Sequence, residues 1–155
     1  GRTSVNMTSA TALELAKLER IGGIKEASGN LTQFAEIAAG APDNFALLSG
    51  DDGLTLPMMS LGCQGVISVA GNVAPRLMKD MMSRWEEGNI DEALETHRKL
   101  MPLFQALFLE TSPAPCKKIL SWMNIGTDEV RLPLASVKPE TESALREAME
   151  YAGLS

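Results

Sequence analysis

The hydrophobic residues of this chain follow two different spacings, one typical of buried strands and one typical of amphipathic helices. Short, nearly continuous apolar runs predict three strands, at residues 21–27, 45–49 and 65–69. Apolar residues spaced three or four positions apart predict helices before, between and after them, at 9–18, 31–40, 54–61 and 75–88. Helices that alternate with strands in this way indicate a parallel α/β sheet with right-handed crossovers.

Residues at the expected helix starts support this assignment. Thr8 or Ser9 can cap the first helix and Asn30 the second, because a side-chain oxygen there can accept a backbone N–H. Pro75 fits the first turn of the fourth helix, where the N–H that proline lacks has no helical partner.

From residue 89 onward the pattern is helical. It predicts three further helices joined by proline-containing loops, at 90–109, 115–123 and 140–152. Pro102 falls inside the first of them and predicts a kink or a division there. We therefore expect an α/β part, residues 1–88, followed by an appended C-terminal helical bundle, residues 89–155.

Composition opposes several classes of protein. A net charge of −6 and a pI near 4.8 argue against a nucleic-acid partner, because phosphates need a basic face. No apolar run approaches the roughly 20 residues of a membrane span, and no signal peptide opens the chain. Cys63 and Cys116 lie far apart, which opposes a disulfide framework and fits a reducing compartment. We expect a cytoplasmic protein that binds neither nucleic acid nor membranes.

No strong metal-binding motif is present in the sequence. The single histidine, His97, lies in the charged run 95–99, and we expect a solvated helix residue rather than a ligand. Asp51 and Asp52 could contact magnesium, but one aspartate pair without further oxygen donors is weak evidence for a metal. A turn followed by a helix cap is the alternative explanation of this pair.

Lys25 lies near the end of a short apolar strand, four residues before Gly29 and the next helix start. Lysine is costly to bury, so a strand that carries one into a barrel or cleft usually does so for chemistry. Desolvation there favours the neutral amine, which can attack a ketone and form a Schiff base. The alternative is a lysine whose ammonium group simply reaches solvent at the strand end.

The carboxyl end of each predicted strand is polar or glycine-rich. These segments are 25–28, 49–53 and 67–72. Ligands of parallel α/β proteins bind at the carboxyl ends of the strands. The sequence therefore predicts one site built from three successive strand ends, with Lys25 in it.

Four segments carry a resemblance to a known family: residues 1–3 (Gly-Arg-Thr), 23–29 (Gly-Ile-Lys-Glu-Ala-Ser-Gly), 48–52 and 65–69. In this order and spacing they resemble the dihydrodipicolinate synthase family. That family belongs to the pyruvate-dependent class I aldolase (N-acetylneuraminate lyase) superfamily of TIM barrels, and the resemblance covers essentially the whole chain. The Gly-Arg-Thr segment favours a synthase over a sialic acid lyase, which shares the lysine and the barrel.

The resemblance implies a role for each matching residue. Lys25 is implied as the lysine that forms a Schiff base with pyruvate, and Arg2 as the residue that binds the carboxylate of aspartate semialdehyde. The backbones of Gly50 and Ile67 are implied to face the pocket beside the lysine. The implied product is 4-hydroxy-tetrahydrodipicolinate, in lysine (diaminopimelate) biosynthesis. No metal or organic cofactor is implied, because the protonated imine is the electron sink.

The family fold is an eight-stranded barrel, and the resemblance implies that this chain is its C-terminal part, with about three parallel strands. The tyrosine proton relay and the Gly-Thr-Thr-Gly-Glu loop that holds pyruvate are implied to lie in a missing N-terminal half. The implied partners are pyruvate, aspartate semialdehyde, that half, and further copies forming a homotetramer. Two alternatives stay open: a sibling aldolase acting on another 2-oxo acid, and a catalytically incomplete half-barrel. Alone, the chain is expected to be inactive.

Overall fold

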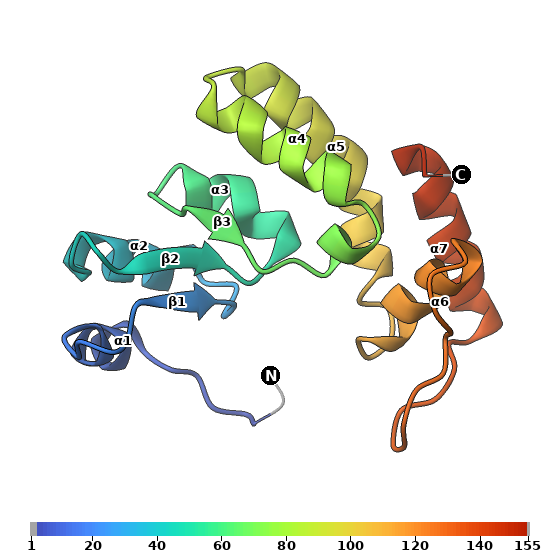
Figure 1. Cartoon of the computed structure of the whole chain (residues 1–155), viewed down its shortest axis with the longest axis horizontal. Helices are drawn as coiled ribbons and strands as arrows, with labels where there is room; N and C mark the ends of the chain where they lie inside the picture. Colours follow the sequence, from blue (N-terminus) through green and yellow to red (C-terminus); the bar gives the residue numbers. More distant parts are fainter. Residues whose placement is uncertain (1–2, 155) are drawn as a thin grey trace. The chain divides into compact units, whose positions relative to one another are not determined.

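The computed structural model describes residues 3–154 of the chain. The chain forms two compact units, residues 1–68 and residues 69–155. The three strands all lie in the first unit, whereas the described part of the second unit is helical (Figure 1).

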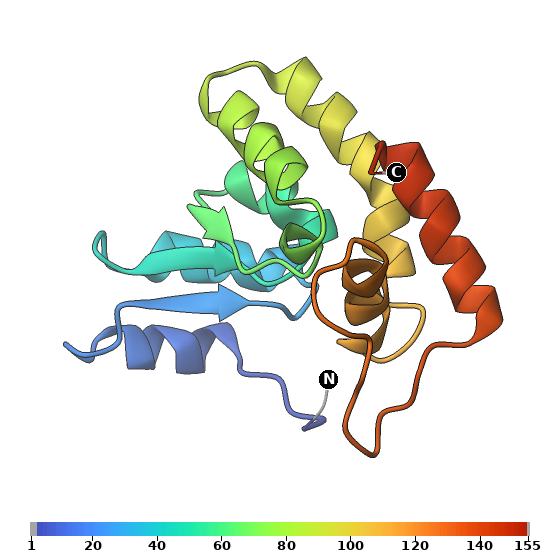
Figure 2. The ribbon, with the colours of Figure 1, turned by 45° about the vertical axis from the view of Figure 1, so that its right-hand side comes forward.

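The first unit alternates helices and strands as predicted. Its elements are α1 (Ser9–Ala16), β1 (Gly23–Glu26), α2 (Leu31–Gly40), β2 (Ala46–Ser49), the 3-10 turn η1 (Asp52–Leu54), α3 (Thr55–Met59) and β3 (Gly65–Val66). The strands form one parallel sheet in the order β1-β2-β3, and the arrows of β1 and β2 run side by side in Figure 2. Lys25 of β1 pairs with Leu48 of β2, which in turn pairs with Gly65 of β3. The predicted parallel sheet is confirmed.

The third strand is shorter than the predicted run 65–69. It pairs with β2 through Gly65 and Val66, and the chain then leaves the sheet. One further backbone bond continues the ladder, from the Ile67 N–H to the Ser49 carbonyl at 2.8 Å. In the described sheet β3 lies at an edge, so it can turn away after two pairs without opening a gap between two neighbours.

Side-chain caps explain where α1 and α2 begin. The Thr8 hydroxyl accepts the backbone N–H three residues on at 3.3 Å, and the Asn30 side chain does the same at 3.1 Å, both as predicted. The helices that follow β1 and β2 contribute fully buried core residues, namely Phe34, Ile37, Leu56 and Met58. Burial of each such side chain stabilises the fold by about 1.5–3 kcal/mol.

The second unit consists, in its described part, of a 3-10 turn and four helices. These are η2 (Ala70–Asn72), α4 (Pro75–Glu86), α5 (Ile90–Ala106), α6 (Ala114–Trp122) and α7 (Pro139–Ala152). The helix α5 packs against both α4 and α7, and α6 packs against α7. Their contacts bury five side chains completely: Met81, Leu100, Leu103, Ile119 and Leu145. None of the helices in residues 3–154 has the length and apolar character needed to cross a membrane.

Pro102 does not divide α5, which is continuous from Ile90 to Ala106. Of the two predicted outcomes, the division is wrong, because Leu100 and Leu103 on either side of the proline are fully buried and their packing holds the helix through the missing hydrogen bond. A kink at Pro102 stays a prediction. The boundary between the two compact units lies after residue 68, because α4 packs along α5 in the second unit. The predicted boundary after residue 88 is a different one: it separates the barrel part from the appended helices, and it stays a prediction.

His97 is half-buried rather than solvated. It shares one face of α5 with the buried residues Ala93, Leu100 and Phe104, and its ring centroid lies 6.0 Å from that of Phe104. Its Nδ1 atom is buried and has no hydrogen-bond partner among the described residues. Desolvation, with a smaller contribution from Arg98, lowers the pKa of His97. The expected solvated position is wrong because the helix face, not the charge of adjacent residues, decides exposure.

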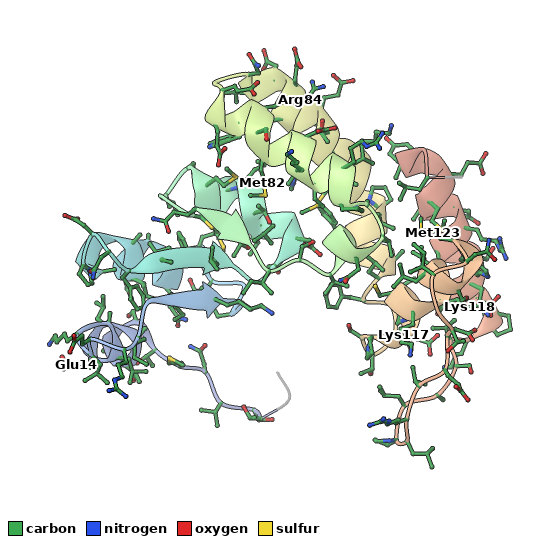
Figure 3. The ribbon with its side chains drawn as sticks, viewed as in Figure 1. Glu14, Met82, Arg84, Lys117, Lys118 and Met123 are labelled. Carbon is green, nitrogen blue, oxygen red and sulfur yellow. The ribbon has the colours of Figure 1, made fainter. Side chains whose placement is uncertain are left out.

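A cluster of ion pairs joins α6, α7 and the loop between them. Nζ of Lys118, labelled on α6 in Figure 3, lies 3.0 Å from Asp128 Oδ2 and 2.9 Å from Glu142 Oε1. The hydrogen bonds that Lys118 donates, to Glu142 first and to Asp128 second, raise the pKa of Lys118, and the bond to Asp128 lowers the pKa of that carboxyl. Arg146 of α7 stacks its guanidinium on the Trp122 ring of α6, at 4.0 Å from the centroid.

Candidate active site

The candidate active site lies at the carboxyl end of the three-stranded sheet. Successive side chains of a strand point to opposite faces, so Lys25 and Ala27 share one face of the sheet and Glu26 lies on the other. The parallel register extends the face of Lys25 across β2 to Gly50 and across β3 to Ile67. The structure therefore brings Lys25, Gly50 and Ile67 together, as the sequence predicted.

Gly50 makes a close approach to the lysine. A Cβ atom at this position would lie 2.7 Å from Lys25 Cε and 2.5 Å from Ala27 Cβ, closer than carbon atoms can approach. The Gly50 N–H donates to the Glu26 carbonyl at 2.7 Å, which holds the two strand ends together beyond the last register pair. Only glycine fits here, and its backbone forms the surface against which the lysine stem lies.

Ile67 extends this surface by one strand. Its backbone is fixed by the bond from its N–H to the Ser49 carbonyl, directly before Gly50. Its side chain is 49% exposed. A ligand that reaches Lys25 from its open face therefore meets the backbone of two neighbouring strand ends.

Lys25 itself is exposed in this chain. The reason is that the helices of the first unit cover only one face of the sheet, and Lys25 lies on the other face. The side that faces the helices buries Glu26, Leu47 and Ser49, whereas the face of Lys25 has no comparable cover within the described unit. The enclosed environment that the sequence suggested for Lys25 is therefore not formed by residues 3–68.

Arg2, the residue expected to bind the second substrate, lies outside the described residues. The segment that follows it is held by α2. Asn6 Nδ2 donates to Gln33 Oε1 at 2.7 Å, and Gln33 Nε2 donates to the Met7 carbonyl at 3.1 Å. The stretch after Arg2 is thus fixed to the helix that directly follows the lysine strand.

Asp51 forms a turn and caps the 3-10 turn η1. Its Oδ1 accepts the Gly53 N–H at 2.9 Å, and its carbonyl accepts the Ser49 and Thr55 hydroxyls at 2.8 and 3.1 Å. Asp52 is 4% exposed. Among residues 3–154, no group of three histidine, cysteine or acidic side chains is placed to hold a metal ion. The turn and cap explanation holds for Asp51.

Comparison with known proteins decides the family. The Dihydrodipicolinate synthetase family matches residues 1–152. The chain belongs to this family. The 4-hydroxy-tetrahydrodipicolinate synthase of Archaeoglobus fulgidus is 50% identical over 149 residues, covering 96% of this chain and 52% of that protein. The synthase of Syntrophotalea carbinolica is 44% identical over 154 residues, covering 99% of this chain and 53% of that protein.

Solved structures of the family agree with this assignment. The dihydrodipicolinate synthase of Cyanidioschyzon merolae, crystallised with lysine bound, superposes with a TM-score of 0.95 at 42% identity, over 99% of this chain and 52% of that one. The Aquifex aeolicus enzyme gives a TM-score of 0.92, also at 42% identity. The predicted family is confirmed, and the chain spans about half the length of the relatives that it matches.

Two polar residues of the predicted strand-end segments 25–28 and 49–53 are buried, which the sequence did not predict. Glu26, adjacent to Lys25, is 4% exposed, and Ser49 at the end of β2 is fully buried. The Ser49 N–H donates to Cys63 Sγ at 3.1 Å, and the Cys63 thiol donates to the Gly65 carbonyl at 3.0 Å. Alternation along β1 could have shown that Glu26 faces the helices, since Lys25 was expected on the other face.

A hollow of about 750 Å³ lies in the first unit but away from the lysine. Its lining includes Gly22, directly before β1, and Asn44, shortly before β2, together with Leu13 of α1 and Lys17, the residue after α1. Gly22 and Asn44 place the hollow at the amino ends of these strands. The chemistry expected at the carboxyl ends therefore has no connection with this hollow.

Proposed function

We propose that this chain supplies the lysine-bearing part of a 4-hydroxy-tetrahydrodipicolinate synthase. The observation that carries the proposal is the position of Lys25 at the carboxyl end of β1, against the bare backbone of Gly50 and on one face with Ile67. Membership of the family and the names of its relatives support the same reaction.

The chemistry begins at Nζ of Lys25. The amine attacks the ketone carbon of pyruvate, and water leaves as the protonated imine forms. The imine accepts the electron pair released when a methyl proton is removed, which gives an enamine. The enamine carbon bonds to the aldehyde carbon of aspartate semialdehyde, which restores the imine to Lys25. The amino group of that substrate then attacks the imine carbon, which closes the ring, and the bond from this carbon to Nζ breaks and frees Lys25. The product is 4-hydroxy-tetrahydrodipicolinate, and the electron sink is the imine itself.

The neighbours of Lys25 receive supporting roles in this proposal. The backbones of Gly50 and Ile67 border the space in which the pyruvate adduct sits. Arg2 binds the carboxylate of aspartate semialdehyde through its guanidinium group, a role carried over from the family motif in which it stands.

The proposed active assembly needs more than this chain. The face of Lys25 is open in the first unit, and in the described sheet β1 and β3 each pair on one side only, which favours pairing with further strands. We assign the remaining strands to an N-terminal barrel half that supplies the proton relay and the pyruvate carboxylate site, within a cytoplasmic homo-oligomer. The chain's share of its relatives' length, about half, supports this.

Reductive trapping tests the proposal. Borohydride treatment in the presence of pyruvate, with the complementary barrel half supplied, should place one reduced pyruvate on the peptide that contains Lys25. The Lys25→Arg variant should remain unmodified. An adduct on another lysine, such as Lys17, together with loss of activity would overturn the assignment. Arg2→Ala should impair use of the aldehyde more than use of pyruvate, and an equal loss would favour an aldolase for another 2-oxo acid.

A further inference from the structure

We propose that Glu26 and Gln33 are positioning residues of this site: together they fix the segment 3–8, which follows Arg2, against the strand that carries Lys25. The inference rests on the proposed function, because it assigns the effect to the aldehyde substrate that Arg2 is proposed to bind. It concerns the covered face of the sheet, opposite to the face where the lysine chemistry takes place.

Glu26 is a buried carboxylate directly behind the lysine. It ends β1 and is 4% exposed. Its Oε1 accepts the Ser28 N–H at 2.8 Å and Gln33 Nε2 at 3.2 Å. Its Oε2 is buried without a hydrogen-bond partner among the described residues. A carboxylate is an expensive group to bury, so its use must be sought in the groups it holds.

Gln33 connects this carboxylate to the segment after Arg2. It is 8% exposed, in the first turn of α2, and Nε2 donates one hydrogen to Glu26 Oε1 and one to the Met7 carbonyl. Both of these acceptors need a donor, so the orientation of the amide is determined and Oε1 must face Asn6 Nδ2, at 2.7 Å. One side chain thus joins three segments of the chain.

The segment 3–8 is tied to α1 at its last residue, Thr8, and the residues before Thr8 depend on the bonds to Gln33. Its residues form neither helix nor strand, and all of them are exposed. Ser4 adopts φ +56°, a left-handed conformation that is unfavourable for a serine and that the surroundings must maintain. If the bonds to Gln33 are lost, the start of the segment is free to move, and with it the proposed site for the aldehyde carboxylate. Lys25, on the opposite face, stays in place.

Backbone NMR order parameters of the 155-residue chain test the connection directly. Gln33→Leu should lower the order parameters of residues 4–8 from about 0.85 to about 0.6 or less, with those of α5 unchanged. Asn6→Ala removes one bond from an exposed position, and it should give a smaller change at the same residues even where the leucine variant does not fold. Glu36→Gln is the matched control, since Glu36 lies on α2 but accepts from Ser9 of α1. Order parameters equal to wild type in both test variants would overturn the proposal.

Steady-state kinetics of the chain assembled with the complementary barrel half distinguish positioning from a general structural role. Asn6→Ala and Gln33→Leu should raise KM for aspartate semialdehyde about tenfold, while KM for pyruvate and trapping at Lys25 change less than about twofold. Glu26→Gln keeps an acceptor at Oε1 and should rescue most of the defect of Glu26→Leu. A parallel rise of both KM values would overturn the inference. Failure of wild-type Lys25 to be trapped would overturn the proposed function instead, and the order parameters of residues 4–8 would still decide the connection.

Discussion

At the scale of single residues, the contact between Lys25 and Gly50 determines what the site can hold. The lysine stem lies over a residue without a side chain, in space that any Cβ would occupy. The close approach also involves Ala27, whose Cβ is fixed to the backbone and cannot rotate away. A larger residue at position 50 must therefore move both the lysine and the strand end.

We expect Gly50→Ala to displace Lys25. Trapping with pyruvate and borohydride should fall by about tenfold or more, because misplacement of a reacting atom by an ångström is costly. The free energy of unfolding should fall by about 1–3 kcal/mol, since the added methyl overpacks the strand end. Gly22→Ala is the matched control, because its Cβ would meet nothing within 4 Å. Equal trapping by the two variants would contradict the arrangement described.

His97 predicts a dependence of stability on pH. Its pKa in the folded state is lowered from 6.5 by desolvation, so the unfolded chain binds the proton more readily. The contribution of neutral His97 is therefore complete above about pH 6.5 and is lost as the pH falls below it. Urea unfolding at about pH 7.5 and about pH 5.5 should show lower stability at the acidic value, and His97→Leu should reduce that difference.

The acidic residues with resolved shifts titrate outside this window, since the pKa values of Asp128 and Glu110 are lowered from 3.8 and 4.5. A pH dependence between about 5.5 and 7.5 that is identical in wild type and His97→Leu would show that the half-buried imidazole makes no contribution to it.

At the scale of elements, α7 is held by groups that are distant in the sequence. The residue before its first turn, Lys138, makes no side-chain cap, and its N–H donates instead to Glu110 Oε1 at 2.8 Å. This bond is the main reason that the pKa of Glu110 is lowered. The helix α7 is also held to α6, by the ion pairs of Lys118 with Asp128 and Glu142. A carboxylate at the start of α7 also interacts favourably with the helix dipole.

Removing the charge of Lys118 should loosen this connection. Lys118→Met leaves Asp128 and Glu142 without their shared cation, so we expect the thermal midpoint to fall by roughly a few degrees. The difference from wild type should shrink in high salt, because screening weakens the pairs in the parent protein. Lys17→Met, which removes an exposed pair with Glu14, is the control and should change the midpoint little. A salt-independent difference would assign the effect to packing against Trp122.

At the scale of the whole molecule, the chain presents one lysine site on an open face and spans about half the length of its relatives. We expect the 155 residues alone to be inactive in condensing pyruvate with aspartate semialdehyde. Lys25 supplies the nucleophile, but a positioned proton donor typically contributes about 10²–10⁴-fold, and the tyrosine relay is assigned to the other half. Loss of the pyruvate carboxylate site removes positioning as well.

Assay of the chain with and without the complementary half measures this expectation. Turnover should appear only in the mixture, and the two pieces should elute together on size-exclusion chromatography. Full turnover by residues 1–155 alone would show that the catalytic groups all lie in this chain.

Several features of this protein followed from the sequence because their causes are local. The caps at Thr8 and Asn30 act on residues three positions away. Nearly continuous apolar runs located the strands, and apolar spacing of three to four positions located the helices. Lys25 at a strand end and the meeting of Lys25, Gly50 and Ile67 also followed, since parallel strands present their carboxyl ends at one edge.

The tertiary structure decided the features that depend on contacts between distant segments. The bond of Asn6 to Gln33 spans 27 positions, and that of Glu110 to Lys138 spans 28, so no local pattern indicated them. The burial of His97 depends on which face of α5 packs inward, and the continuity of α5 through Pro102 depends on the same packing. Local spacing determines which element a segment forms, whereas burial and polar pairing are determined only when elements meet.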